Sequence, residues 1–224
     1  MRSYVGNKNF SNVIHFLVNH LPLSSRYFSL FFGSGGLENS IYTASSKWIC
    51  SEIDPNCKKY EKPPQSMIEF SDYKDLIESF VFTRSDLIFA DPPYILSSRS
   101  SDKKYYKFEF TTRDHIEFLN YMISINSNIM ITHPECGLYS SFLHEWFSFP
   151  FSYMTRGGIF KDCLYSNFSI GSRVQLLSYD CLGHNFIDRQ RIKRQRSNIV
   201  NKFKRLNPQI RFALLKALKK ENLL

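Results

Sequence analysis

The sequence predicts an α/β fold in which a mostly parallel sheet is covered by helices on both faces. Short apolar runs, each the length of a buried strand, recur along the chain, and helical stretches separate most of them. Gly157-Gly158 is expected to turn a late antiparallel hairpin. With 224 residues, 43% of them hydrophobic, the chain can form one such domain with a sizeable core and a small appendage. The strands are expected near Tyr27, Lys47, Ser66, Ser85, Asn128 and Phe149.

The first element is expected to be an amphipathic helix that ends near Pro22, because proline does not continue a helix. Its apolar side chains recur at helical spacing and are interpreted as core. They are Phe10, Val13, Ile14, Leu17 and Leu21.

A glycine turn is expected after the first strand. The apolar run Tyr27–Phe32 leads into Gly33-Ser34-Gly35-Gly36, and a helical stretch, Leu37–Ser45, follows. Glycines at such a turn allow positive φ and close approach of the backbone to a ligand, as in nucleotide-binding βα turns. Phe32, Gly33 and Gly35 are therefore candidate cofactor-binding residues.

An acidic residue follows the second strand at the spacing used to hold ribose hydroxyls, about 20 residues beyond the glycines. Glu52 is the candidate for this role, and Asp54 is expected to begin the next turn with Pro55. After the third strand, Asp72 could accept a hydrogen bond from the adenine amine of a cofactor. Equally, Ser71 or Asp72 could cap the following helix.

The most informative segment is Asp91-Pro92-Pro93-Tyr94, which follows the strand Ser85–Ala90. The two prolines stiffen the turn at the carboxyl end of that strand, where open α/β folds bind ligands. The Asp91 carboxylate and the Pro92 carbonyl could then accept hydrogen bonds from one exocyclic amine while Tyr94 stacks on the attached base. This pattern favours methylation of an amino group. The alternative is an ordinary strand-ending turn in which Asp91 caps a helix and Tyr94 packs.

A loop without clear periodicity, Ile95–Thr112, lies beside this segment, and long loops in compact domains are often functional. Its basic residues could contact phosphates, and its tyrosines could stack on displaced bases. The alternative is a disordered polar loop. The candidates are Arg99, Lys103, Lys104, Lys107, Tyr105 and Tyr106.

Positive charge is concentrated in the C-terminal segment. Residues 184–224 contain twelve Lys or Arg and two Asp or Glu, a net charge of +10, whereas the preceding 183 residues sum to −1. A nearly neutral domain with a basic extension is typical of a polyanion-binding protein, although a solvated helix surface would give the same pattern. The candidate nucleic-acid contacts are Arg189, Arg191, Lys193, Arg194 and Arg196. Asn207-Pro208 is expected to begin a last helix that docks on the domain or on a partner protein.

Other classes of protein are not indicated. Five cysteines without CxxC spacing predict neither a zinc site nor a secreted disulfide framework, and the histidines show no metal-binding spacing. We expect no metal, and we interpret the histidines as packing or surface residues. No signal segment or membrane-spanning apolar run is present, so the cytoplasm is the expected location.

Together these segments resemble the bacterial and phage DNA adenine methyltransferases of the Dam-like class. Tyr4-Val5-Gly6-Asn7-Lys8 is similar to the family's aromatic-x-Gly-Gly-Lys segment, in which the aromatic residue and the lysine touch the cofactor; Asn7 departs from the usual glycine. Phe32-Gly33-Ser34-Gly35-Gly36 is similar to its Phe-x-Gly-x-Gly turn. Asp162–Asn167 is similar to the late hairpin strand, where the family often has Glu in place of Asp162.

Further matches lie in segments typical of phage members. They are Ser98-Arg99-Ser100, Tyr105-Tyr106, Asp114-His115, Leu182–Phe186 and Arg189–Arg194. One departure is that only 54 residues separate Gly36 from Asp91, so the target-recognition domain found there in many members does not fit. Sequence readout would then fall to the Ile95–Thr112 loop, the hairpin and the basic tail.

The resemblance implies a Rossmann-like S-adenosylmethionine-dependent methyltransferase fold over residues 1–183 and a basic helical extension over residues 184–224. It implies that S-adenosylmethionine is the cofactor, bound with help from Tyr4, Lys8 and Asp91. The substrate would be the N6 amine of adenine in duplex DNA, flipped out of the helix, in a bacterial or phage-infected cell. Adenine in RNA, cytosine in DNA and a catalytically silent nucleic-acid-binding module remain alternatives.

Overall fold

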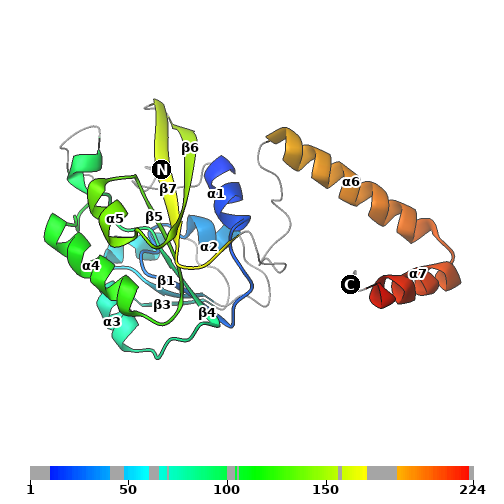
Figure 1. Ribbon diagram of the computed structural model, residues 1–224, viewed down its shortest axis with the longest axis horizontal. Coiled ribbons are helices and arrows are strands. Elements are labelled where there is room, and N and C mark those ends of the chain that lie inside the picture. The colour runs from blue at the N-terminus through cyan, green and yellow to red at the C-terminus, as the bar shows by residue number, and fades with distance from the viewer. Residues whose placement is uncertain are drawn as a thin grey trace. The chain divides into compact units, whose positions relative to one another are not determined.

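The computed structural model describes residues 11–40, 48–60, 66–69, 71–99, 106–155, 158–170 and 186–221, together with Lys104. The chain divides into two compact units, residues 1–178 and residues 179–224, and each is described by itself. The first unit contains the sheet (Figure 1). Within the described ranges, no helix is long and apolar enough to cross a membrane.

The sheet has seven strands in the order β3-β2-β1-β4-β5-β7-β6. The first five strands of this order pair in parallel, and β7 runs antiparallel to both β5 and β6. The predicted mostly parallel sheet with a late antiparallel hairpin is therefore confirmed. The strands are β1 Arg26–Ser29, β2 Trp48–Ser51, β3 Met67–Glu69, β4 Asp86–Ala90, β5 Asn128–His133, β6 Phe147–Thr155 and β7 Gly158–Ser166.

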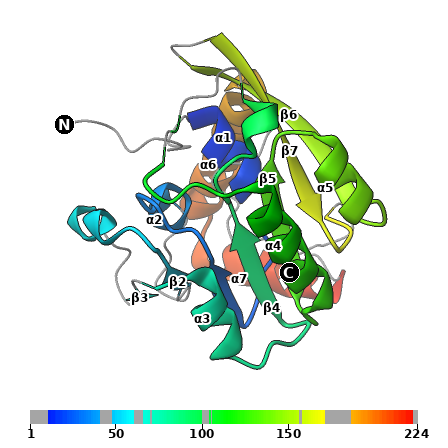
Figure 2. The ribbon, with the colours of Figure 1, turned by 90° about the vertical axis from the view of Figure 1, so that its left-hand side faces the viewer.

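Helices cover both faces of the sheet, as predicted. In Figure 2, α3, α4 and α5 lie in front of the sheet, and Figure 1 shows α1 and α2 on the opposite side. The helices of this unit are α1 Ser11–Val18, α2 Gly36–Ser40, α3 Tyr73–Glu78, α4 Thr112–Ser124 and α5 Gly137–Phe142, with 3₁₀ turns η1 Pro55–Lys59 and η2 Leu96–Ser98.

One hydrophobic cluster of the core lies between the sheet and the layer formed by α3, α4 and α5. Phe118 and Leu119 of α4 are fully buried against strand residues such as Phe28 and Ile131. Each such side chain contributes roughly 1.5–3 kcal/mol by leaving water. On the other face, the predicted stripe on the first helix is confirmed as core for Val13, Ile14, Leu17 and Leu21; Phe10 lies outside the described residues.

The first strand is shorter than predicted. Strand β1 ends at Ser29, but the backbone N–H groups of Leu30 and Phe32 still donate to Phe89 and Ser51 at 3.1 and 3.0 Å. The chain therefore stays bonded to its neighbours up to the glycine turn, which fixes the position of that turn. The helix that follows is described from Gly36 to Ser40, and residues 41–47 lie outside the described ranges.

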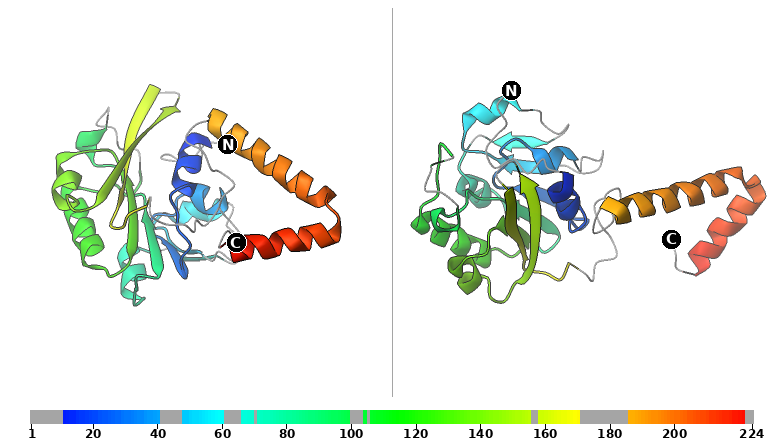
Figure 3. Two further views of the ribbon diagram at one scale, coloured as in Figure 1. Left: turned by 45° about the vertical axis from the view of Figure 1, so that its right-hand side comes forward. Right: turned by 90° about the horizontal axis from the view of Figure 1, so that it is seen from above.

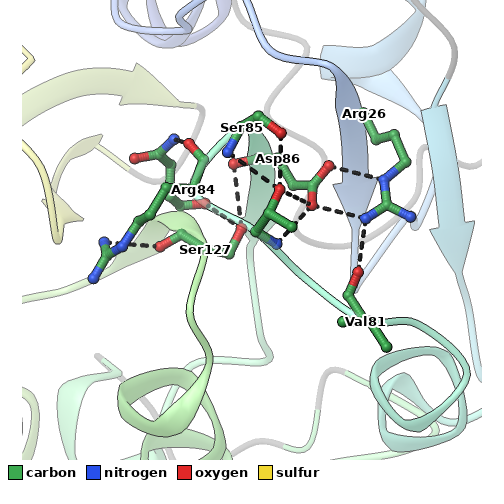
Figure 4. A network of polar contacts seen from close by, with 8 residues as sticks. Arg26, Val81, Arg84, Ser85, Asp86 and Ser127 are labelled. Carbon is green, nitrogen blue, oxygen red and sulfur yellow. Dashed lines mark hydrogen bonds and ion pairs between the residues drawn. The ribbon is translucent and has the colours of Figure 1, made fainter.

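A polar network anchors the amino end of β4 (Figure 4). Arg26 donates from Nε and Nη2 to the two carboxylate oxygens of Asp86, both at 2.8 Å, and the Thr83 amide donates to the same carboxylate. Burial alone would raise the pKa of Asp86, but the hydrogen bonds from Arg26 and Thr83 lower it overall. This network ties β1 to β4, the strand that delivers Asp91.

In the described part of the second unit, residues 186–221, the helices are α6 Phe186–Arg205 and α7 Pro208–Lys220, drawn orange and red in Figure 3. As predicted, Asn207 caps α7, since its side chain accepts from the Gln209 and Ile210 amides and Pro208 follows. Apolar side chains of α7, including Ile210 and Leu214, are exposed. Docking of this helix on the domain or on a partner stays a prediction.

Candidate active site

The carboxyl ends of the parallel strands surround a cavity of about 510 Å³. Its walls come from the glycine turn after β1, the end of β2, the start of α3, the tetrapeptide after β4 and the loop before α4. Among the predicted site residues that line it are Phe32, Gly33, Glu52, Asp72, Asp91 and Pro93. The sheet thus brings the candidate cofactor residues and the segment that begins at Asp91 to a single cavity, as expected for open α/β folds.

Glycine is required in the turn. Gly33 and Gly35 adopt φ angles of 56° and 67°, in the left-handed region that favours glycine. A Cβ added to Gly35 would lie 2.3 Å from Cζ of Phe32, whose ring is 4% exposed. The turn is therefore packed against Phe32 with no room for a side chain.

Glu52 holds the glycine turn in place. Its Oε2 accepts from the Gly33 amide at 2.6 Å, and its Oε1 accepts from the Asp54 amide at 2.8 Å. Burial raises the pKa of Glu52, while these amide hydrogen bonds oppose that shift. A carboxylate has about four lone-pair sites, so these two bonds leave acceptor capacity for ribose hydroxyls. Asp54 begins the next turn as predicted, since its Oδ1 accepts from the Asn56 amide at 3.0 Å.

Asp72 is the N-cap of α3. Its Oδ1 accepts from the Lys74 amide at 3.0 Å, which confirms the capping interpretation. The same residue lines the cavity, so capping does not exclude contact with a ligand.

Glu38 is a cavity residue that sequence reasoning missed. It lies in α2, is 3% exposed and lines the cavity. Burial, with a smaller contribution from the negative charge of Asp91, raises its pKa to about 7. In the sequence, an acidic residue in the first turn of a helix is explained by the helix dipole, so its burial could not be recognised.

Asp91 follows the last residue of β4 and is oriented by the neighbouring strand. Ala90 pairs with Ile131, and the next residue of β5, Thr132, donates from Oγ1 to Oδ1 of Asp91 at 2.8 Å. Thr132 is fully buried. The alternative interpretation requires Asp91 to cap the element that follows it. The 3₁₀ turn η2 instead has Ile95 at its N-cap, so Asp91 does not cap that turn. Within the tetrapeptide, Pro92 is buried and Pro93 lines the cavity.

Tyr94 is half-buried, and its hydroxyl donates to Oδ2 of Asp162, on β7, at 2.5 Å. Its ring makes a T-shaped contact with the ring of His133, at a centroid distance of 5.3 Å and an angle of 66°. Burial and the negative charges of Asp91 and Asp162 raise the pKa of Tyr94 well above its usual value. The hydroxyl therefore stays protonated and acts as a donor.

Arg99 is a buried residue that hydrogen-bonds to the backbone of the tetrapeptide. It donates through Nε to the Tyr94 carbonyl at 2.8 Å and pairs with Glu109, Nη2 to Oε2, at 2.5 Å. The Arg99 side chain is 6% exposed, so these contacts give it a structural role in the loop rather than a surface position. Tyr106 lines the cavity beneath the Arg99 guanidinium, 5.5 Å from its ring centroid. Lys104 is exposed.

Four predicted residues, Tyr4, Lys8, Lys103 and Tyr105, lie outside the described ranges.

Two histidines, His115 and His133, are packing residues, as predicted. His133 stacks on Tyr139 at 3.7 Å, and its Nε2 accepts from the Ile95 amide at 3.1 Å, which fixes the chain just after the tetrapeptide. His115 bonds the Tyr139 hydroxyl through Nδ1, and burial lowers its pKa to about 4. Among the described residues, no group of three or more His, Cys, Asp or Glu side chains is placed to hold a metal ion.

The basic residues of α6 are mostly exposed. Arg191, Lys193, Arg194 and Arg196 present their side chains to solvent, and Arg189 is half-buried. Arg191 pairs with Asp188 one turn earlier at 3.2 Å. The helix thus presents several cations along its length.

No protein-family model and no curated protein sequence matches this chain. Solved structures do match. The N-methyltransferase NodS from Bradyrhizobium japonicum is 7% identical, covers 73% of this chain and 99% of its own, and has a TM-score of 0.47. An rRNA methylase from Streptococcus thermophilus is 10% identical over 68% of this chain and 93% of its own, with a TM-score of 0.44.

A SAM-dependent methyltransferase from Agrobacterium tumefaciens is 12% identical over 70% of this chain and 59% of its own, with a TM-score of 0.46. These likenesses concern the fold alone, which the strand order and the late antiparallel hairpin define independently. The chain has a Rossmann-like α/β fold, defined by its own strand order and late antiparallel hairpin. Because one fold hosts many reactions, the activity has to be argued from the cavity.

Proposed function

We propose that this chain is a DNA adenine methyltransferase, which transfers a methyl group from S-adenosylmethionine to the exocyclic N6 amine of adenine. One observation carries the proposal. The glycine turn and Glu52 line the same cavity as Asp91 and Pro93 of the tetrapeptide. A nucleoside cofactor on the first set of residues would therefore lie beside an amine held by the second.

The charge of the cavity suits this cofactor. Two lysines, Lys74 and Lys107, line it, whereas its acidic lining residues are Glu38, Glu52, Asp54, Asp72, Asp91, Glu109 and Asp114. S-adenosylmethionine bears a sulfonium and an ammonium group against one carboxylate, so a predominantly acidic lining attracts it. Glu52 would hold the ribose and Asp72 the adenine amine, while Phe32, Gly33 and Gly35 form the close-packed turn beside the cofactor.

The chemistry requires alignment more than activation. The sulfonium of the cofactor already activates its methyl group. The chain has to hold the attacking nitrogen in line with that group, an orientation effect that can lower the barrier by several kcal/mol. Hydrogen bonds from the two amine hydrogens to Asp91 and to the Pro92 carbonyl would favour a tetrahedral nitrogen, and Thr132 holds the Asp91 carboxylate in place.

Adenine in a duplex cannot reach the cavity while it is stacked and paired, so it must be flipped out, at a cost of a few kcal/mol. The Tyr94 ring would receive it. The exposed cations of α6, together with Lys104 and the β6–β7 hairpin, would contact the DNA backbone and flanking bases.

Transfer of labelled methyl groups tests this proposal. The full chain is incubated with labelled S-adenosylmethionine and, in parallel, with unmethylated duplex DNA or RNA, and the product nucleosides are then separated. Label in N6-methyladenine from DNA supports the proposal. Label only in RNA, or only in methylated cytosine, contradicts it, as does cofactor binding without transfer to any nucleic acid.

A further inference from the structure

A partly buried hydrogen bond joins the tetrapeptide to the late hairpin. Asp162 lies on β7, opposite Phe151 of β6, and is 3% exposed. Its Oδ2 accepts the hydroxyl of Tyr94 at 2.5 Å, although 68 residues separate the two in the sequence. At this distance the bond is a charge-assisted O–H···O⁻ contact, which is about twice as strong as a neutral hydrogen bond.

The bond fixes the plane of the Tyr94 ring together with a second contact. The Tyr94 and His133 rings meet in a T-shaped contact at 66°, and His133 is itself stacked on Tyr139 at an angle of 5°. Tyr153 of β6 also lies against Tyr94 and Asp162. The hydroxyl is therefore held by Asp162 and the ring packs against His133, which restricts rotation about the Cα–Cβ and Cβ–Cγ bonds.

We propose that Asp162 is a positioning residue for the acceptor base. It acts through the Tyr94 hydroxyl and holds the ring in the orientation on which the flipped base stacks. This inference rests on the proposed function, because only an acceptor base that enters beside Asp91 would use the ring. A stacking surface already held before the base arrives avoids the loss of side-chain freedom on binding.

A buried carboxylate is costly unless its hydrogen bonds compensate for lost hydration. A purely structural role would be filled as well by an apolar side chain, since the neighbouring hairpin residues are aromatic: Phe151 stacks on Tyr153, and Tyr153 stacks on Phe160. The carboxylate instead accepts from Tyr94, the residue of the tetrapeptide on whose ring the base is expected to stack.

A double-mutant cycle tests the proposal. The variants of the cycle are Asp162→Asn, Tyr94→Phe and the two combined. Asp162→Glu is a conservative variant that keeps the carboxylate. Asp75→Asn, on the exposed side of α3, is a matched control. We expect each single change to lower kcat/KM for DNA about tenfold, and the double variant to lose no more than Tyr94→Phe alone. The dissociation constant of S-adenosylmethionine should stay unchanged, and Asp162→Glu should recover most of the activity.

The outcomes separate the two claims. Multiplicative losses in the double variant, wild-type activity of Asp162→Asn, or an equal loss of cofactor binding would overturn the role of Asp162 while the wild-type enzyme still methylates DNA. A wild-type chain that transfers no methyl group to DNA would overturn the proposed function itself, and the role of Asp162 with it. Thermal unfolding of each variant identifies any loss that is due to misfolding.

Discussion

Thr132 donates a hydrogen bond of 2.8 Å to Asp91 from the adjacent parallel strand. The two residues stand at the carboxyl ends of β5 and β4, where Ile131 and Ala90 pair. The bond holds the Asp91 carboxylate at the wall of the cavity, where an acceptor amine would enter. The sheet therefore contributes to the orientation of the carboxylate through a buried threonine of the adjacent strand.

Removal of this bond should slow the reaction without weakening cofactor binding. In Thr132→Val the side chain keeps its shape but cannot donate, so we expect kcat to fall about tenfold from misorientation of Asp91. Thr132→Ser keeps the hydroxyl and should retain most activity. Initial rates under saturating cofactor measure this; equal activity of the Val and Ser variants would contradict it.

Glu38 should make the protein less stable as the pH rises. Its pKa is about 7 in the folded chain and 4.5 for the ordinary group, so its stabilising contribution is complete below pH 4.5 and is lost as the pH rises through 7. At pH 8, the free energy of unfolding of Glu38→Gln should therefore exceed that of the wild-type chain by up to about 3 kcal/mol, measured by denaturant unfolding. At pH 4 the two proteins should have similar stability; a stabilisation equal at both pH values would contradict this explanation.

The same substitution should weaken binding of the cationic cofactor. An ionised Glu38 attracts a positive ligand, so wild-type affinity for S-adenosylmethionine should increase from pH 6 to pH 8. Glu38→Gln should reduce this pH dependence and should bind S-adenosylmethionine roughly tenfold more weakly at pH 8. The substitution would then increase stability and decrease function. Calorimetric titration at several pH values measures both effects. Equal pH dependence in both proteins would exclude Glu38 as the titrating group.

Gly35→Ala should prevent the cofactor from binding beside the glycine turn. The new Cβ would overlap the Phe32 ring and force a strained φ, so we expect loss of cofactor binding and a destabilisation of about 1–3 kcal/mol. Gly137→Ala is the matched control, because a Cβ there meets no atom within 4 Å. It should leave cofactor binding intact. Similar effects of the two changes would show that the turn has no special role.

The cations of α6 should govern the salt dependence of DNA binding. Replacement of Arg191, Lys193 and Arg194 by Gln should reduce the slope of log affinity against log salt by about 0.9 for each DNA phosphate that the variant no longer neutralises. The comparison variant replaces three lysines of α7, Lys216, Lys219 and Lys220. An identical change in slope would indicate general charge rather than a binding site on α6.

The sequence was sufficient for the parts of the site that follow from strand order. The glycine turn, Glu52 and Asp91 each follow a buried strand, and the carboxyl ends of parallel strands meet at one edge, so their convergence could be predicted. Thr132 and Asp162 could not, because each contacts the tetrapeptide from a strand more than 35 residues away in the sequence. No local pattern encodes such a pairing.

Burial of charged side chains is the second reason why the site differs from what the sequence predicts. The basic loop predicts a phosphate contact for Arg99, yet its side chain turns inward to Glu109 and the Tyr94 carbonyl. Glu38 was overlooked for the converse reason, since a charged side chain is seldom fully buried. In both cases, tertiary contacts determine which charged groups face the cavity, and composition alone does not reveal them.

The central claim is that Asp91 holds an adenine amine beside a bound methyl donor, and Asp91→Asn tests it most directly. The measurement is the amount of N6-methyladenine formed in duplex DNA by the wild-type chain and by this variant, with cofactor affinity determined in parallel. We predict a loss of at least about 100-fold in methyl transfer and a much smaller loss of cofactor affinity, because Asp91 is one of several residues that line the cavity. Methylation of DNA by the variant at the wild-type rate, or a wild-type product other than N6-methyladenine, would contradict the account.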